Sequence, residues 1–95
     1  MALKFSGHAE TSQIIALKAL GYLAADDVLL EPFLGSTGLV VADLRAGATD
    51  SAFLAGILDY FMQNEALLLA FAASEELAPE TIVRARQRLP GALND

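Results

Sequence analysis

The spacing of the apolar residues constrains the fold of this chain more than any other feature of its sequence. Apolar and polar residues do not alternate as in a half-buried β-strand, and they recur instead at the three- and four-residue spacing of an α-helix. Ala and Leu, both good helix formers, help to raise the apolar share to 55%. A chain of 95 residues suffices for one domain with one core. We therefore expect an all-α fold in a single helical domain that spans residues 1–95.

Capping residues and breakers divide this pattern into helices. A first helix from about Ala9 to Ala25 is apolar on nearly all sides, which is typical of a central, buried helix. Asp26–Asp27, Asp50 and Asn64 are good N-cap residues for later helices. Pro32 is expected to kink or restart the second helix. The further predicted helices cover about 28–37, 41–46, 51–63, 65–75 and 79–89.

The chain matches itself when it is shifted by 38 residues. Segments 14–47 and 52–85 then align without a gap and share seven identical residues, most of them apolar. The identical pairs are Leu20 with Leu58, Tyr22 with Tyr60, Leu29 with Leu67, Leu30 with Leu68, Phe33 with Phe71, Ser36 with Ser74 and Leu39 with Leu77. Chance similarity between two Leu-rich helical stretches is the alternative. We expect a small five- or six-helix orthogonal bundle made of two similar three-helix halves, with frayed ends at 1–8 and 91–95.

Composition and charge disfavour several classes of function. The chain has no cysteine, which excludes disulfides and thiol catalysis and fits a reducing, cytoplasmic location. Its 12 acidic and 6 basic residues give a net charge of −6, which disfavours nucleic acid and anionic membranes as partners. The apolar run 66–73 is far shorter than the roughly 20 residues of a membrane span. We therefore expect a cytoplasmic protein without a membrane partner.

The polar residues form no recognisable catalytic or metal-binding pattern. His8 is the only histidine, and one His without Cys can neither build a typical zinc site nor complete a catalytic triad. Asp27 and Glu31 lie one helical turn apart, but acids are normal in the first turn of a helix. The segment Gly35–Gly38 lacks the lysine of a phosphate-binding loop and ends a predicted helix. The sequence therefore predicts no enzyme, no cofactor and no metal site.

The apolar share is high for so short a chain, and this surplus predicts a surface that binds another molecule. The apolar rims of the second, fourth and fifth predicted helices are the candidate surfaces. The predicted interaction residues are Leu30, Phe33, Leu54, Phe61 and Leu69. The sequence thus favours a protein–protein interaction or adaptor module, with an unknown protein or a second copy of the chain, in a homodimer, as its partner.

Two alternative functions stay open. The aromatic residues of the two halves could line a pocket for a small apolar ligand, although aromatic residues at helical spacing more often form plain core. Arg84 and Arg88 share one face of the last helix and would be the basic contacts of a DNA-binding regulator. In the alternative interpretation, the last helix is a plain surface helix. Glu80 then pairs with Arg84, and the aliphatic part of the Arg86 side chain lies over the core.

Five stretches of the sequence carry a resemblance to a known family. They are Ala16–Asp26, Gly38–Ala46, Asp50–Ala55, Glu65–Phe71 and Arg84–Gly91. With them the chain resembles, from about Ile15 to Gly91, a family of short alphaproteobacterial proteins known as a domain of unknown function, number thirty-five seventy-two. Members usually have proline at three positions, which are the one after the acid at Asp26, that of Val41 and that of Ser51. This chain departs at all three. The resemblance implies a small helical fold and assigns no catalytic residues.

Overall fold

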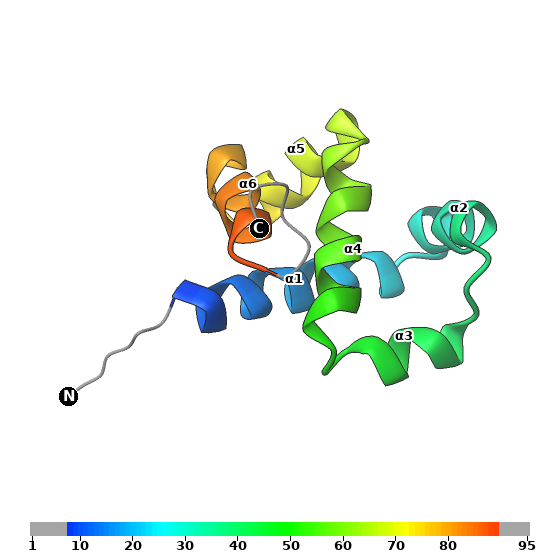
Figure 1. The fold of residues 1–95 in the computed structure, drawn as a ribbon. Helices are drawn as coiled ribbons and strands as arrows, with labels where there is room; N and C mark the ends of the chain where they lie inside the picture. The colour runs from blue at the N-terminus through cyan, green and yellow to red at the C-terminus, as the bar shows by residue number, and fades with distance from the viewer. Residues whose placement is uncertain (1–7, 90–95) are drawn as a thin grey trace.

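The computed structural model describes residues 8–89 of the chain, which fold into an all-α bundle (Figure 1). The helices are α1 (His8–Ala24), α2 (Asp27–Thr37), α3 (Val41–Gly47), α4 (Ser51–Met62), α5 (Glu65–Ser74) and α6 (Pro79–Gln87). No strand lies in this range, so the predicted fold class is confirmed. Of the ends that we expect to fray, only His8 lies within the described residues, and it begins α1.

Side-chain caps fix the beginnings of three helices. Asp26 and Asp50 each accept a hydrogen bond from the backbone N–H two residues later, at 2.9 and 3.0 Å. Asn64 accepts one from the N–H three residues later, at 3.3 Å. These bonds satisfy donors that the first turn of a helix leaves without an intrahelical partner. The three predicted caps are therefore confirmed, and every helix end lies within two residues of its expected position.

Pro32 lies inside α2, and the helix does not restart there. Because proline has no N–H, the carbonyl of Val28 lacks the donor that would normally come from four residues later. Val28 and Pro32 are both exposed, so water can solvate this carbonyl. The helix therefore continues through Pro32.

One apolar core joins all six helices. In Figure 1, α4 stands across α1, and α1 also packs against α2 and α6. Leu23 of α1 and Phe61 of α4 are fully buried at the centre. Edge-to-face contacts with Phe71 extend this centre, with ring centroids 5.2 Å from Phe61 and 5.4 Å from Tyr22. α1 thus packs against three helices, as expected of a central helix, but the expected burial was wrong, since Ile14 and Leu17 are 50% and 46% exposed.

Three helix boundaries of the first predicted half coincide with those of the second. The 38-residue shift places the starts of α2 and α3 on those of α5 and α6, and the end of α1 on that of α4. Gly38 and Glu76, one shift apart, both have a left-handed backbone, with φ of 77° and 57°. The hydroxyls of Ser36 and Ser74 each donate to the carbonyl three residues earlier, at 3.2 and 2.9 Å. The origin of these halves by duplication stays a prediction.

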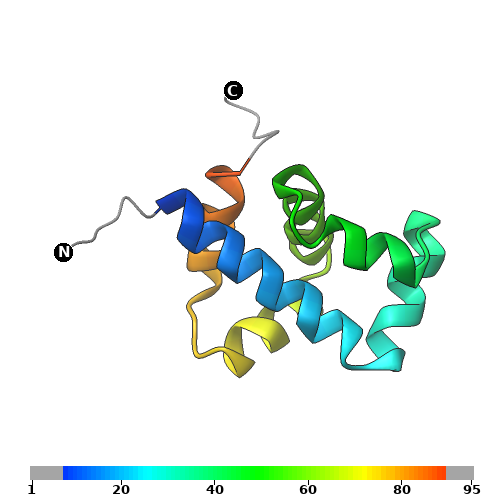
Figure 2. The ribbon, with the colours of Figure 1, turned by 90° about the horizontal axis from the view of Figure 1, so that it is seen from below.

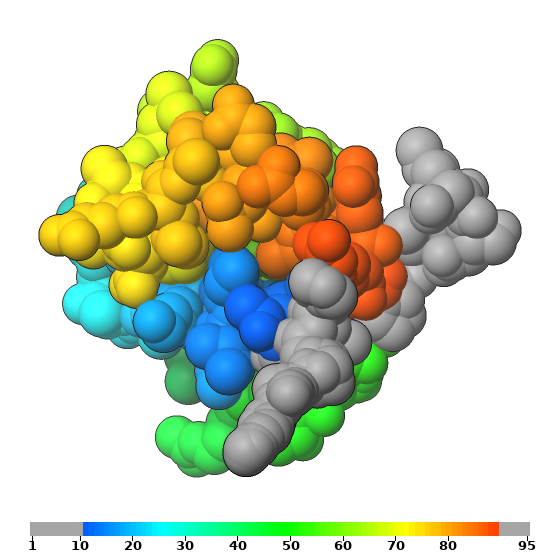
Figure 3. All heavy atoms as spheres, turned by 90° about the vertical axis from the view of Figure 1, so that its left-hand side faces the viewer, coloured from blue at the N-terminus to red at the C-terminus, as the bar shows by residue number. Residues whose placement is uncertain are grey.

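The last helices of the two halves differ in how they pack. α6 packs against α1, α4 and α5, and in Figure 3 α5 and α6 lie above α1 on one face of the molecule. α3 packs mainly against α4 (Figure 2). At its end Gly47 lies against the ring of Phe53, where a Cβ would come within 2.3 Å of a ring carbon. Only glycine therefore fits at this close approach of α3 to α4.

Candidate functional site

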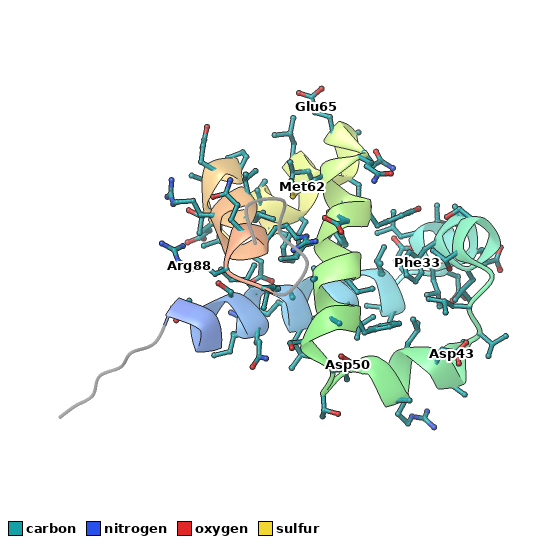
Figure 4. The ribbon with its side chains drawn as sticks, in the orientation of Figure 1. Phe33, Asp43, Asp50, Met62, Glu65 and Arg88 are labelled. Carbon is teal, nitrogen blue, oxygen red and sulfur yellow. The ribbon has the colours of Figure 1, made fainter. Side chains whose placement is uncertain are left out.

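Four of the five predicted interaction residues belong to the core. Leu30, Phe33, Leu54 and Phe61 are between 0% and 9% exposed, whereas Leu69 is 47% exposed. Figure 4 shows Phe33 between α2 and α4. The prediction of a surface was wrong for these four because a helix that is apolar on most sides does not reveal from sequence which side faces its neighbours. Leu69, on α5, is the one that stays accessible to a partner.

An open apolar hollow of about 280 Å³ lies between α2 and α5, and we call it the α2–α5 groove. Its lining residues are Val28, Leu29 and Pro32 of α2, Ala66, Leu67 and Ala70 of α5, and Tyr22, Tyr60 and Asn64. Figure 2 shows α5 and the beginning of α2 on either side of the C-terminal end of α1, which carries Tyr22. The groove therefore crosses the boundary between the two predicted halves.

Residues one 38-residue shift apart line this groove together. The four equivalent pairs are Tyr22 with Tyr60, Val28 with Ala66, Leu29 with Leu67, and Pro32 with Ala70. Both tyrosine rings are partly exposed, and neither hydroxyl makes a hydrogen bond within residues 8–89. An apolar hollow between the halves, which the ligand-binding alternative requires, is thus present and offers two phenol hydroxyls.

A polar hollow of about 610 Å³, which we call the polar cleft, continues the groove along α2. Its lining residues are Ser36, Thr37, Gly56, Asp59, Tyr60, Gln63, Asn64 and Glu65. Tyr60 and Asn64 line both hollows, so the two are contiguous. The beginning of α2 borders the apolar part and its last turn borders the polar part. Together they form one depression that is apolar at one end and polar at the other.

The three helices that supply most of the lining of this depression carry acids and no bases. α2, α4 and α5 contain Asp27, Glu31, Asp59 and Glu65, and none of the three contains Lys, Arg or His. Glu65 points away from the bundle at the corner between α4 and α5 (Figure 4). Acids on one side of a small protein attract cations to that side. Asp59 and Glu65 line the polar cleft and form the acidic border of the depression, whereas Asp27 and Glu31 lie outside the lining of both hollows.

The arginines near the C-terminus have two different environments. Arg86 is turned inward, with its side chain 13% exposed, and forms a two-point ion pair with Asp59: Nε to Oδ1 at 2.5 Å and Nη2 to Oδ2 at 3.1 Å. Arg84 and Arg88, the predicted basic contacts, are exposed, and Arg88 points away from the bundle (Figure 4). No ion pair joins Arg84 to Glu80 in the described chain, so that pair was wrongly predicted.

The described residues form neither a cluster of metal ligands nor a membrane-spanning helix. No group of three or more His, Cys, Asp or Glu side chains in this part of the chain could hold a metal ion. Among its helices, none has both the length and the apolar character to cross a membrane.

Sequence reasoning missed the groove residues Val28, Pro32, Ala66 and Ala70. Their spacing carries a signal, because positions 28 and 32, and positions 66 and 70, lie one helical turn apart and share a helix face. The same spacing is equally typical of a core-facing stripe. Only the packing of α2 and α5 beside α1 and α4 distinguishes the two cases.

Comparison with known proteins gives one match. The model of the family described as a protein of unknown function (DUF3572) matches residues 9–92. No curated protein sequence and no solved structure matches the chain. The resemblance expected from the five sequence stretches is therefore confirmed. Since the match spans nearly the whole sequence, the chain belongs to the DUF3572 family.

Proposed function

We propose that this chain is a protein–protein interaction module that binds its partner along the α2–α5 groove. The observation that carries the proposal is an exposed apolar strip on the two helices that flank the groove. This strip consists of Val28, Pro32, Ala66, Leu69 and Ala70. Val28 is 78% exposed and Leu69 47% exposed. Large apolar side chains gathered beside a groove are typical of a surface that a partner covers.

A protein covers this strip better than a small molecule does. The groove holds about 280 Å³ and is open to solvent, whereas a pocket for a drug-sized ligand usually holds roughly 300–1,000 Å³ and encloses most of the ligand. Leu69 lies outside the lining of the groove, on the same helix as Ala66 and Ala70. A partner that covers both the groove and Leu69 must therefore extend beyond the hollow.

An adaptor role has some support from a second apolar surface. Ile14 and Leu17 of α1 are 50% and 46% exposed, and they line a hollow of about 340 Å³ together with Ala48 and Leu54. This hollow shares no residue with the α2–α5 groove. Two distinct apolar surfaces would allow one small chain to hold two partners, or one partner and a second copy of itself.

A small apolar ligand is the second candidate for the same groove. The observation that favours it is the pair of accessible phenol hydroxyls of Tyr22 and Tyr60, which could hydrogen-bond a polar group on an otherwise apolar molecule. Such a ligand would fill the hollow and leave Leu69 uncovered. The two candidates therefore differ in whether substitution of Leu69 affects binding.

The test is the native mass of the protein purified gently from its own cells, measured for the wild type and two variants. We expect the wild type to carry the mass of an additional protein chain. Leu69→Glu should lose that mass, because it places a charge in the apolar interface. Val41→Glu is the matched control, since Val41 is 53% exposed on α3. Both variants should stay folded because both positions are exposed.

Each other outcome of this measurement has a defined meaning. A wild-type mass of one bare chain, or an additional chain that Leu69→Glu retains, would contradict the proposal. An additional mass of small-molecule size that Leu69→Glu retains would favour the second candidate. A whole multiple of the chain mass that only Leu69→Glu abolishes would identify a second copy as the partner.

A further inference from the structure

We infer that the partner segment is a basic amphipathic helix, which lays its apolar face in the α2–α5 groove and its cationic side chains over the acidic border. The inference rests on the proposed function and specifies the chemistry of the partner. It follows from the shape of the depression, the placement of charge around it and the polarity of its two ends.

The shape of the depression fits a helix. α2 has 11 residues and is therefore about 16 Å long at roughly 1.5 Å per residue, and the groove and the polar cleft together follow it from Val28 to Thr37. A groove between two helices commonly receives the apolar face of a third, through anchors spaced one turn apart. The small side chains of Ala66 and Ala70 on the rim let a partner backbone come close.

The charge around the depression selects a basic partner. Of the two acids that line the depression, Glu65 is exposed and makes no ion pair among the described residues, whereas Asp59 is paired with Arg86. Lys or Arg on the part of an incoming helix that lies over the polar cleft would therefore meet the Glu65 carboxylate, which has no cation in this part of the chain. Exposed ion pairs add little affinity but raise the association rate and reject acidic partners.

The two ends of the depression predict the orientation of the partner. The apolar groove takes the anchor side chains, and the polar cleft beyond it is lined by Gln63, Asn64 and the partly exposed Tyr60. α2 and α4 end at the cleft and α5 begins there, so two negative helix ends, one positive helix end and the Glu65 carboxylate lie there. The end of the partner helix over the polar cleft should therefore carry a lysine or an arginine.

A second copy of this chain fits the depression less well. α6 and the residue after it carry three of the arginines, but its apolar residues Ile82 and Ala85 are buried against the bundle. Val83 is its only other large apolar residue and is only partly exposed, so α6 has little apolar surface to insert. A symmetric dimer through the strip would bring two acidic borders together, and such like-charge contacts oppose association.

The probe that tests the inference is a short synthetic peptide of Leu and Lys, patterned as an amphipathic helix, titrated into the full chain by calorimetry. A Leu/Glu peptide with the same leucine positions is the first control. We expect the Leu/Lys peptide to bind and the Leu/Glu peptide to bind at least about tenfold more weakly at low salt. The difference should shrink as salt screens the border.

Protein variants separate specific docking from general attraction between a cation and an acidic protein. Ala70→Arg fills the groove and should weaken binding of the Leu/Lys peptide at least about tenfold. Ala42→Arg adds the same charge at an exposed position of α3 and should change binding by less than about twofold. Glu65→Gln should weaken binding of the Leu/Lys peptide and reduce its salt dependence, whereas Glu80→Gln on α6 should not.

Several results would overturn the inference. They are equal binding of both peptides, equal loss in Ala70→Arg and Ala42→Arg, and no binding of the Leu/Lys peptide at low salt. A native dimer that Ala70→Arg converts to a monomer would also overturn it, because the occupant would then be a second copy. If native mass still shows a protein chain that Leu69→Glu removes, the interaction function stands and only the partner chemistry is wrong.

Discussion

At the scale of single residues, Glu76 adopts a backbone conformation that suits glycine. Its φ of 57° ends the turn after α5, and the N–H of Leu77 donates to the carbonyl of Ala72 at 2.9 Å, which fixes that turn. A left-handed conformation costs an L-residue about 1–2 kcal/mol, and glycine does not incur this cost. The equivalent position of the other half holds Gly38, with φ of 77°.

Glu76→Gly should therefore stabilise the protein, and Gly38→Ala should destabilise it. We expect each change in the free energy of unfolding to be about 1 kcal/mol, because the greater freedom of unfolded glycine offsets part of the relieved strain. Urea denaturation of both variants and the wild type measures these changes. A loss of stability in Glu76→Gly would show that the carboxylate, not the backbone, determines the residue at this turn.

Residue chemistry predicts helix caps better than it predicts exposure. Asp26, Asp50 and Asn64 could be identified as caps because each bonds to backbone within three residues of itself, so the whole interaction is local. Phe61 and Leu69 both lie on apolar helices, yet one is 0% and the other 47% exposed. Their difference depends on which helices pack against α4 and α5, and no local pattern contains that information.

At the scale of helices, an ion pair links α4 to α6. Both nitrogen–oxygen contacts between Arg86 and Asp59 are short, and the arginine side chain is mostly buried. The pair of Lys18 with Glu75 differs, since its single contact is 3.5 Å long and its side chains are 55% and 31% exposed. A two-point pair with a buried guanidinium stabilises a fold more than an exposed one-point pair does.

Asp59→Asn should accordingly lower the free energy of unfolding more than Glu75→Gln does. We expect a loss of about 1–2 kcal/mol for Asp59→Asn, below the range for fully buried pairs because Asp59 is 44% exposed. Glu75→Gln should change stability by at most about 0.5 kcal/mol. Thermal unfolding of both variants at low and high salt provides the measurement, and equal losses would contradict the assigned difference.

At the scale of the whole molecule, the acidic border of the groove shows what sequence could not predict. The net charge of −6 follows from composition, but the positions of the charged residues on the folded molecule do not. Asp59 of α4 and Glu65 of α5 both reach the polar cleft because these helices meet there, while the described bases lie on α1, α3, α6 and the residue after α6. The predicted repeat placed equivalent residues in register, yet only the packing of the halves brings Tyr22 and Tyr60 to one groove.

The packing between the halves also predicts how the protein unfolds. α1, from the first half, packs against α4 and α6 of the second, and one core cluster contains residues of all six helices. Neither half can keep this core alone, so unfolding should occur in one cooperative transition. The chain has two tyrosines, one in each half, and no tryptophan. Tyr22→Phe and Tyr60→Phe therefore each leave a fluorescent probe in one half.

These two variants should unfold in urea with a single transition each, and in each the tyrosine signal should coincide with the loss of helix measured by circular dichroism. Replacement by Phe should disturb packing little, because neither hydroxyl makes a hydrogen bond in the described part of the chain.

Fragments 1–48 and 49–95 should each be largely unfolded. The first would expose the face of α1 that α4 and α6 cover, and the second would expose the faces of α4 and α6 that α1 covers. Two separate transitions, or a fragment that unfolds cooperatively by itself, would instead show that the halves are independent folding units.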